Sequence, residues 1–285
     1  MEFPLSAQTP NKEKSQVRVG PYTFKPNSFL MIAGPCSIES EEQAFDIAMA
    51  VRKSGAHILR GGAFKPRTSP YSFQGLGHEG LRILSQVKKE LQMPIVTEVM
   101  DVRDLENVAE VADLVQIGTR NMQNFSLLKE LGRINKPIML KRGLAATIKE
   151  WLLSAEYILK HGNDNVILCE RGIRSFDPET RNLLDLSAVA LIREMSHLPV
   201  IVDPSHALGR RDILEPMTKA AMACGSYGAM IEVHDRPELA LSDGAQAINY
   251  ADFDFMSKNL RKMATALDIH IPSNQPVQSS QVLSL

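Results

Sequence analysis

The sequence predicts a closed (β/α)8 TIM barrel preceded by a short β-hairpin. From Phe29 onward, short apolar strands alternate with segments of helical period, and strand starts are separated by roughly 20 to 37 residues, as strand–loop–helix units require. The eight predicted strands begin near residues 29, 57, 94, 114, 138, 166, 200 and 228. Eight such units favour a closed barrel over an open sheet, and a chain of 285 residues is long enough for one.

The helical segments carry a start signal and apolar stripes. The run Ser40-Glu-Glu-Gln43 has the capping-box pattern that begins a helix. The apolar positions that follow recur at helical spacing: Ala44, Ile47, Ala48 and Val51. Similar stripes occupy residues 148–159 and 214–224. We interpret these faces, Trp151 included, as the surfaces that pack on the barrel.

The ends of the chain differ from the barrel in composition. The first residues are polar, contain prolines and show no period, which is typical of a mobile segment. The next stretch alternates around Gly20-Pro21 like a hairpin, and we expect it to cap one end of the barrel. The predicted boundaries are 1–16 for a flexible N-terminal arm, 17–28 for the hairpin, 29–268 for the catalytic barrel and 269–285 for a C-terminal tail.

The overall charge argues against two classes of partner. Its 32 Lys and Arg residues nearly balance 33 Asp and Glu residues, giving a formal net charge of −1, whereas general binders of nucleic acid or anionic membranes need a large basic excess. The three cysteines, Cys36, Cys169 and Cys224, show no paired spacing, and no apolar run approaches 18 residues. We therefore expect a cytoplasmic protein that binds neither nucleic acid nor a membrane.

The chemistry should lie at the strand tips, because loops after the carboxyl ends of barrel strands build the site in this fold. Basic residues gather there in a chain that is nearly neutral. Six of them follow four different predicted strands: Arg60, Lys65, Arg67, Arg120, Lys141 and Arg171. Cations at one rim focus a positive field, and guanidinium groups match phosphate and carboxylate oxygens. The pattern predicts a cleft that binds two anionic groups.

A second set of strand-tip residues has the chemistry of metal ligands. Cys36, His206, Glu232 and Asp243 follow the first, seventh and eighth strands, which become neighbours when a barrel closes. One thiolate, one imidazole and two carboxylates suit a borderline divalent transition ion better than Mg²⁺ or Ca²⁺. Taken singly, a cysteine such as Cys36 is more often a buried thiol, and a lone histidine is more often a satisfied core group than a ligand. His234, two residues after Glu232, is a candidate for supporting these ligands.

Five ordered motifs carry a family likeness. They are Ala33-Gly-Pro-Cys-Ser37, Arg60-Gly-Gly-Ala-Phe-Lys-Pro-Arg-Thr-Ser69, Gly118-Thr-Arg-Asn-Met-Gln-Asn-Phe125, Asp203-Pro-Ser-His206 and Leu241-Ser-Asp-Gly244. With them the chain resembles the type I-beta 3-deoxy-D-arabino-heptulosonate 7-phosphate (DAHP) synthases, from about Val17 to Leu267. The resemblance implies a transferase of (β/α)8 fold that condenses phosphoenolpyruvate with erythrose 4-phosphate and releases phosphate. That reaction opens the shikimate pathway to chorismate and the aromatic amino acids.

The resemblance also implies roles for individual residues. Cys36, His206, Glu232 and Asp243 match the family's ligands for one divalent metal ion, which is Mn²⁺, Fe²⁺, Zn²⁺ or Co²⁺. Arg60, Lys65, Arg120, Lys141 and Arg171 match its phosphoenolpyruvate site, and Arg67 with Thr68 matches its aldose-phosphate site. We also count Pro66, in the same loop, among the substrate-binding residues. We expect Lys65 to serve as a cation or general acid, and Glu98 and His206 to position the attacking water.

Three other functions are open at this stage. The sister enzyme 3-deoxy-manno-octulosonate 8-phosphate synthase uses arabinose 5-phosphate, but typically has Lys-Ala-Asn-Arg-Ser-Ser where this chain has Lys65-Pro-Arg-Thr-Ser69. Pro66 shortens and stiffens that loop, which favours the four-carbon sugar. A Schiff-base aldolase with Lys141 as nucleophile and a non-catalytic phospho-ligand barrel are the alternatives. We further expect a homo-oligomer, either a dimer or a tetramer. We also expect a separate regulatory partner, because the N-terminal extension is too short for a fused regulatory domain.

Overall fold

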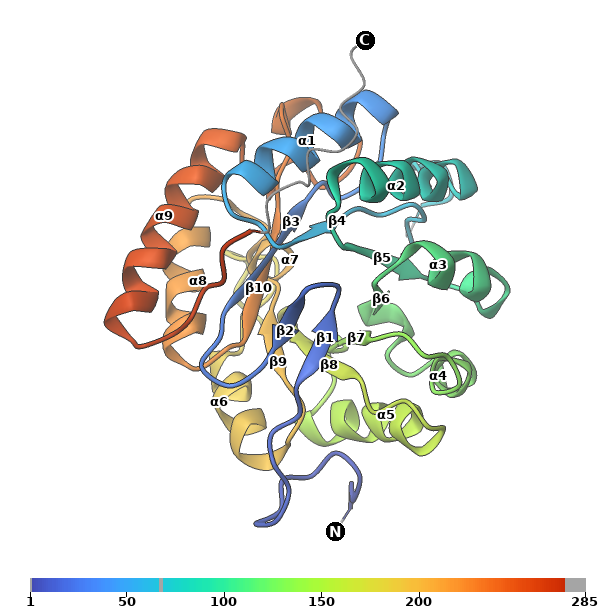
Figure 1. Ribbon diagram of the computed structural model, residues 1–285, viewed down its shortest axis with the longest axis vertical. Helices are drawn as coiled ribbons and strands as arrows, with labels where there is room; N and C mark the ends of the chain where they lie inside the picture. Colours follow the sequence, from blue (N-terminus) through green and yellow to red (C-terminus); the bar gives the residue numbers. More distant parts are fainter. Residues whose placement is uncertain (1, 67–68, 275–285) are drawn as a thin grey trace.

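Eight parallel strands form a closed barrel, which confirms the predicted architecture (Figure 1). The structure is a computed structural model and describes residues 2–66 and 69–274. Around the barrel the order of strands is β10-β3-β4-β5-β6-β7-β8-β9. Their bounds are β3 (Leu30–Gly34), β4 (Ile58–Arg60), β5 (Ile95–Val99), β6 (Leu114–Ile117), β7 (Ile138–Lys141), β8 (Val166–Glu170), β9 (Val200–Val202) and β10 (Gly228–Glu232).

Helices alternate with the strands and surround the barrel. They are α1 (Glu41–Lys53), α2 (His78–Leu91), α3 (Leu105–Val111), α4 (Phe125–Leu131), α5 (Ile148–Lys160), α6 (Leu186–Met195), α8 (Leu214–Ala223) and α9 (Tyr250–Ala266). Short helices lie at strand tips: η1 (Val102–Asp104), η2 (Thr119–Asn121), α7 (Pro204–Leu208) and η3 (Pro237–Leu239). As predicted, Ser40 begins α1, because its side chain accepts a hydrogen bond from the Gln43 N–H.

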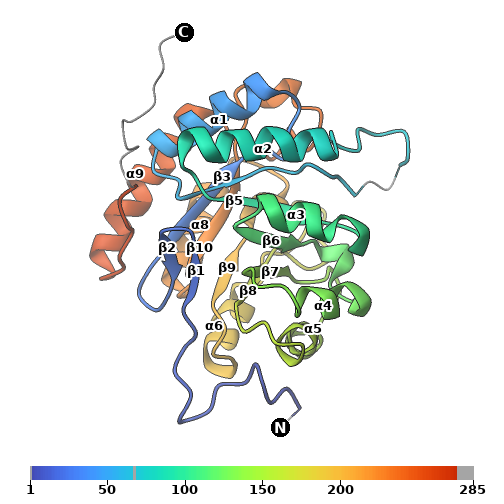
Figure 2. The same ribbon diagram turned by 45° about the vertical axis from the view of Figure 1, so that its right-hand side comes forward.

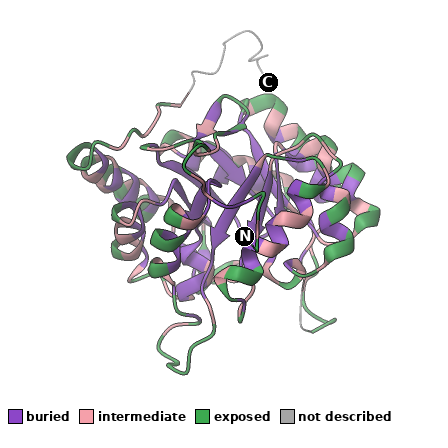
Figure 3. Cartoon of the chain, turned by 90° about the horizontal axis from the view of Figure 1, so that it is seen from below, coloured by how far each residue is buried: buried purple, intermediate pink, exposed green. Residues whose placement is uncertain are grey.

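The core has two layers, one on each face of the barrel wall. Apolar helix faces pack on the outside of the strands, and Trp151 of α5 is fully buried there, with its indole N–H donating to the Leu140 carbonyl of β7. Inward-facing residues such as Ile32 and Met230 fill the interior. Figure 3 shows the strands in the buried colour and the outer helix faces exposed. Within the described residues, no helix combines the length and apolarity needed to cross a membrane.

The predicted hairpin covers the N-terminal end of the barrel (Figure 2). Its strands β1 (Val17–Val19) and β2 (Tyr22–Phe24) pair antiparallel, and their inward side chains join the apolar cluster of the barrel interior. Gly20 turns the hairpin at φ +57°, where a Cβ would come within 2.7 Å of Pro94, just before β5. Its position fits the expectation of a cap, and it closes the end opposite the strand tips.

Residues 2–16 are docked on the barrel, where the sequence predicted a flexible arm. The N–H and Oγ of Ser6 both donate to Oε1 of Glu156 in α5, at 2.6 and 2.7 Å. The Gln8 N–H donates to the Met195 carbonyl at the end of α6. The carbonyl of Leu5 contacts Nε2 of buried His197 at 2.7 Å. Backbone groups therefore tie this N-terminal extension to two helices.

The predicted C-terminal tail falls partly within the described residues. The His270 carbonyl accepts a hydrogen bond from the Phe29 N–H, and the Pro272 carbonyl lies 2.9 Å from Nε2 of His57. These contacts hold the chain after α9 against the start of β3 and β4. The rest of the predicted tail, 275–285, lies outside the described residues.

Candidate functional site

A polar cavity of about 340 Å³ opens at the carboxyl ends of the strands. Its lining residues are Arg60, Lys65, Pro66, Ser69, Ser72, Glu98, Gln116, Gly118, Thr119, Arg120, Lys141, Arg171, Arg181, His206 and Asp243. The structure thus brings together most of the residues predicted from the strand tips. Arg67 and Thr68, predicted for the same loop as Lys65, lie outside the described residues. The size suits small anionic metabolites.

Four potential metal ligands meet at one side of this cavity. One ligand atom from each of Cys36, His206, Glu232 and Asp243 lies within 4.8 Å of all the others. They converge because β10 pairs with both β3 and β9: Cys36 follows β3, His206 lies in α7 after β9, and Glu232 and Asp243 belong to β10 and its loop. We call these four residues the metal group.

The metal group has the chemistry that a divalent transition ion requires. Nε2 of His206 lies 3.2 Å from Oε1 of Glu232, and Sγ of Cys36 lies 3.3 Å from Oδ2 of Asp243. Oε1 of Glu232 is buried and makes no well-formed hydrogen bond among the described residues. Burial, followed by the nearby Glu232 carboxylate, raises the pKa of the Cys36 thiol to about 12. A sulfur, a nitrogen and two oxygens fit a borderline cation.

Buried cations adjoin the metal group and line the cavity. The Nζ of Lys65 donates to both the carbonyl and Sγ of Cys36, each at 2.9 Å. Nη1 of Arg60 lies 3.0 Å from Oε1 of Glu232. Nη1 of Arg171 is buried and has no hydrogen-bond partner among the described residues, and burial lowers the pKa of this guanidinium. Such donors are positioned to bind an anionic ligand.

Glu98 is fixed at the tip of β5 by its neighbours on β6. The side-chain amide of Gln116 donates to Oε2 of Glu98 at 2.8 Å. Gly118 leaves room for the carboxylate, because a Cβ at this position would lie 2.1 Å from Oε1 of Glu98. The carboxylate of Glu98 is therefore held in one place on the cavity wall, opposite the tips of β9 and β10 in the barrel order.

Sequence reasoning assigned no role to three residues of this region. Gln116 is the partner of Glu98, and Arg181 lines the cavity, donates to Gln246 at 3.0 Å and lies 4.0 Å from Oδ1 of Asp243. Arg181 comes eleven residues after β8, so a search of the residues directly after each strand passes over it. Asp203 does follow β9 directly and belongs to the motif Asp203-Pro-Ser-His206. Its side-chain contacts are visible only in the folded chain.

His234 is buried but faces away from the metal group, towards the start of α1. Its Nδ1 lies 3.0 Å from Oδ1 of Asp235, and its Nε2 lies 3.3 Å from the amide of Gln43 and 3.7 Å from Glu39. These contacts join the loop after β10 to the loop after β3. None of them reaches a member of the metal group, so the predicted role of His234 in supporting the ligands stays a prediction.

Two further contacts connect the same two loops, and we call them the loop latch. The hydroxyls of Ser37 and Ser242 are buried and 2.7 Å apart, and Oε1 of Glu39 accepts a hydrogen bond from the Leu241 N–H at 2.9 Å. Asp243 follows directly and has φ +54°, an uncommon backbone conformation for a residue other than glycine. The latch therefore fixes the loop that carries this member of the metal group.

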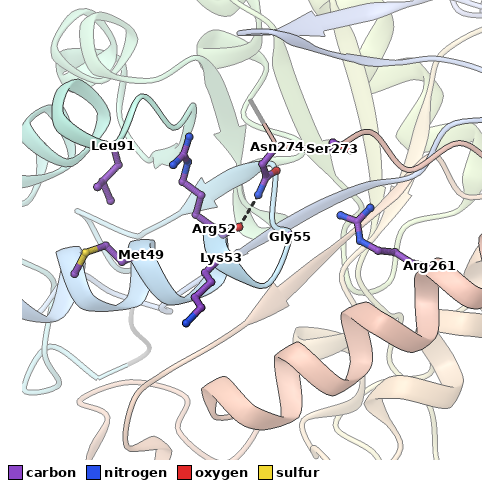
Figure 4. A pocket seen from close by; sticks show the side chains of 8 residues that line it. All are labelled: Met49, Arg52, Lys53, Gly55, Leu91, Arg261, Ser273 and Asn274. Atoms are coloured by element: carbon purple, nitrogen blue, oxygen red, sulfur yellow. Dashed lines mark hydrogen bonds between the residues drawn. The ribbon is translucent and has the colours of Figure 1, made fainter. Parts of the chain in front are cut away.

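A second cavity, of about 450 Å³, lies at the opposite end of the barrel (Figure 4). It is lined by Met49, Arg52, Lys53, Gly55, Leu91, Arg261, Ser273 and Asn274. Arg52 and Lys53 occupy the last turn of α1, where basic side chains complement the negative end of the helix dipole. The metal group and the buried cations adjoin the strand-tip cavity, which we therefore take as the candidate site.

Comparison with known proteins agrees with this geometry. Residues 8–268 match the profile of the DAHP synthetase I family. The phospho-2-dehydro-3-deoxyheptonate aldolase of Thermotoga maritima is 48% identical over 269 residues, which are 94% of this chain and 80% of the relative. A 2-dehydro-3-deoxyphosphooctonate aldolase of Syntrophotalea carbinolica is 32% identical, covering 90% of this chain and 98% of the relative.

Solved structures give the same result. The crystal structure of the Thermotoga maritima phospho-2-dehydro-3-deoxyheptonate aldolase (DAHP synthase) superposes with a TM-score of 0.91, covering 94% of this chain and 78% of that one. A truncated form of the 3-deoxy-D-arabino-heptulosonate 7-phosphate synthase from the same organism gives 0.89 at 44% identity, covering 95% of this chain and 100% of that one. With its barrel, its strand-tip cavity and its match over residues 8–268, this chain belongs to the DAHP synthetase I family.

Proposed function

We propose that this protein is a metal-dependent DAHP synthase, a transferase of the shikimate pathway. It joins C3 of phosphoenolpyruvate to the aldehyde carbon of erythrose 4-phosphate, water adds to C2 of the enolpyruvate, and phosphate leaves by cleavage of its C–O bond. The observation that carries the proposal is the metal group beside a cavity rich in buried cations. Membership of the family supports the same activity.

One divalent metal ion would be held by Cys36, His206, Glu232 and Asp243, whose ligand atoms already converge. When bound, the ion supplies a Lewis acid at the aldehyde oxygen, where negative charge develops during carbon–carbon bond formation. The two carboxylates balance the charge of the ion, and the thiolate favours a transition metal over Mg²⁺ or Ca²⁺. Mn²⁺, Fe²⁺, Zn²⁺ and Co²⁺ all meet these requirements.

The cations of the cavity would bind phosphoenolpyruvate through its phosphate and carboxylate groups. The set comprises Arg60, Lys65, Arg120, Lys141 and Arg171. Arg60, Lys141 and Arg171 are at most 6% exposed, so their contacts with an anion are little weakened by water. The Nζ of Lys65, between Cys36 and the cavity, is placed to hold a proton near the aldehyde oxygen. Glu98 and His206 line the same cavity and are our candidates for positioning the water.

The second substrate would lie nearer the mouth, beside the loop that follows β4. Pro66, Ser69 and Ser72 of this loop line the cavity. Arg67 and Thr68 lie between them in sequence, and we propose that they bind the phosphate of erythrose 4-phosphate. Pro66 restricts the backbone of this loop and thereby sets the distance between the two anion sites.

The octulosonate synthase activity remains the second candidate, because relatives named 2-dehydro-3-deoxyphosphooctonate aldolase are 29–33% identical to this chain. The Schiff-base mechanism is less well supported. The Nζ of Lys141 lies 2.5 Å from the buried carboxylate of Asp203, which holds it as an ion pair rather than as a free amine nucleophile. From the family resemblance we also propose a cytoplasmic homo-oligomer with a separate regulatory partner.

The test is to incubate the purified protein with phosphoenolpyruvate and either erythrose 4-phosphate or arabinose 5-phosphate at one fixed metal concentration. We expect release of phosphate and formation of the heptulosonate with the four-carbon sugar, abolished by a chelator and restored by added metal. Cys36→Ala should stay inactive in excess Mn²⁺, whereas the matched control Cys224→Ala, outside the cavity, should behave as wild type. Full activity in chelator would contradict the metal role, and preference for the five-carbon sugar would favour the second candidate.

A further inference from the structure

Asp203 occupies a special position at the tip of β9. It is fully buried, and it is the N-cap of α7, where its Oδ1 accepts a hydrogen bond from the His206 N–H at 3.0 Å. This contact satisfies one donor of the short helix. It leaves the second carboxylate oxygen, Oδ2, free of any capping role.

That second oxygen contacts two functional residues at once. Oδ2 of Asp203 lies 2.5 Å from Nζ of Lys141, at the end of β7, and 2.8 Å from Nδ1 of His206, in α7. His206 belongs to the metal group, and Lys141 to the cations that line the cavity. One buried carboxylate thus stands between a metal ligand and an anion-binding lysine.

We propose that Asp203 is a positioning residue that aims His206 at the metal and Lys141 at phosphoenolpyruvate. The inference rests on the function proposed above and adds a residue and a role to it. The contact between Oδ2 of Asp203 and Nδ1 of His206 has an ion-pair distance without the alignment of a hydrogen bond. A carboxylate this close to Nδ1 favours a proton on that nitrogen and leaves the lone pair of Nε2 for the metal. Consistent with this, Nε2 faces the other side of the ring and lies 3.2 Å from Glu232 and 3.9 Å from Asp243.

The same carboxylate fixes Lys141. A long lysine side chain loses rotational freedom when it binds a ligand, and a buried ion pair has already removed that freedom before the ligand arrives. Asp203 therefore orients both the metal ligand His206 and the anion-binding Lys141, so that its loss should weaken metal binding and substrate binding together. A residue that only capped α7 would change neither after replacement by asparagine, which retains a capping oxygen.

The experiment uses Asp203→Asn and follows Co²⁺ binding to the metal-stripped protein through the thiolate-to-cobalt absorption band, in the absence of substrates. We expect the affinity for Co²⁺ to fall by about 10- to 100-fold, as for other carboxylates behind a ligating histidine. The KM for phosphoenolpyruvate, measured at saturating metal, should also rise. Lys141→Gln should raise that KM and leave Co²⁺ affinity unchanged, and the double variant should raise it no further than Lys141→Gln does.

The chain offers a matched control at Asp185. It is the N-cap of α6, accepts the Ala188 N–H through Oδ1 and pairs with the Arg142 guanidinium at 2.9 Å through Oδ2, but it contacts no member of the metal group. Asp185→Asn should leave Co²⁺ affinity as in the wild type. If Asp203→Asn fails to fold, Asp203→Ser, which keeps a capping oxygen, takes its place.

Two results would overturn the proposal: wild-type Co²⁺ affinity in a folded Asp203 variant, or an equal loss of affinity in Asp185→Asn. Either outcome is separable from failure of the proposed function. Loss of the Co²⁺ band in Cys36→Ala and product formation by the wild type test that function without involving Asp203.

Discussion

At the scale of single residues, His57 shows how burial determines a protonation state. Its ring is 1% exposed, Nδ1 accepts the Met31 N–H at 2.9 Å, and Nε2 lies 2.9 Å from the Pro272 carbonyl, to which it must donate. The neutral imidazole with its proton on Nε2 satisfies both partners. Burial lowers the pKa of His57 from 6.5 to about 4, although the backbone hydrogen bonds act in the opposite direction.

This histidine makes stability depend on pH. The pKa of His57 is lowered in the folded state relative to its value of 6.5 in the unfolded chain. Its contribution to the free energy of unfolding is therefore complete above pH 6.5 and is lost as the pH falls towards 4. Between pH 8 and pH 5 we expect His57 to account for a loss of about 2 kcal/mol in the free energy of unfolding. Urea titrations at both pH values should show a correspondingly smaller loss in His57→Gln. A substitution at exposed His78 is the control, and an unchanged difference in His57→Gln would refute the assignment.

Residue types and their place at strand tips predicted which side chains converge at the candidate site, but the sequence did not predict their individual contacts. Cys36, His206, Glu232 and Asp243 stood at strand tips that a closed barrel makes neighbours, so their convergence followed from topology. The partners of Asp203, by contrast, depend on side-chain directions at the tips of both β7 and β9. A strand-by-strand pattern does not contain that information.

At the scale of elements, the loop latch makes the first and last barrel loops one unit. Ser242→Ala would leave the buried hydroxyl of Ser37 without its partner, at 2.7 Å in the wild type, and we expect a loss of about 1–2 kcal/mol in the free energy of unfolding. The double variant Ser37→Ala with Ser242→Ala removes both hydroxyls and should regain most of that loss. Chemical denaturation of the three metal-free proteins measures the effect. A double variant that is less stable than the single one would show that the hydroxyls do not act as a pair.

The elements themselves were largely predictable. Periodicity located the strands and the helices α1, α5 and α8, and capping chemistry located the start of α1 at Ser40. The short elements at the tips, such as α7 and η2, were not predicted, because runs of three to five residues carry no period that could be recognised. They nevertheless carry His206 and Arg120, so part of the site depends on local structure that only the fold reveals.

At the scale of the whole molecule, the docked N-terminal extension links α5 to α6. Glu156 on α5 accepts hydrogen bonds from the N–H groups of Leu5 and Ser6 and from the Ser6 hydroxyl. Glu156→Ala removes these acceptors, and we expect residues 2–16 to exchange their amide hydrogens markedly faster while the barrel is unaffected. Hydrogen exchange read by mass spectrometry is the measurement.

Glu150→Ala is the control for this prediction, because Glu150 lies on the same helix and caps its start without touching the extension. It should change exchange in the first turn of α5 only. Equal protection of residues 2–16 in wild type and Glu156→Ala would mean that other contacts, such as that between Gln8 and Met195, suffice to hold the extension.

The global fold was predictable because the strand–loop–helix pattern is repeated eight times, so that an error in one unit does not change the number of units. The docking of residues 2–16 was not predictable. Their sequence is polar, and backbone hydrogen bonds such as that of the Gln8 N–H provide much of what holds them. Any sequence can make such bonds, so they leave no apolar period that could be recognised. Polar composition predicts mobility only where the backbone finds no partner.

The hairpin at the base of the barrel also limits where ligands can enter the site. With that end filled by Val17, Val19 and Phe24, the strand-tip mouth is the route that the described residues leave for ligands. Buried Arg60 and Arg171 lie deeper than exposed Ser69 and Ser72. On the assignment of the two anion sites proposed above, we expect the molecule bound at depth to enter first and to be covered by the second. The kinetics should then be sequential, with phosphoenolpyruvate binding before the sugar phosphate.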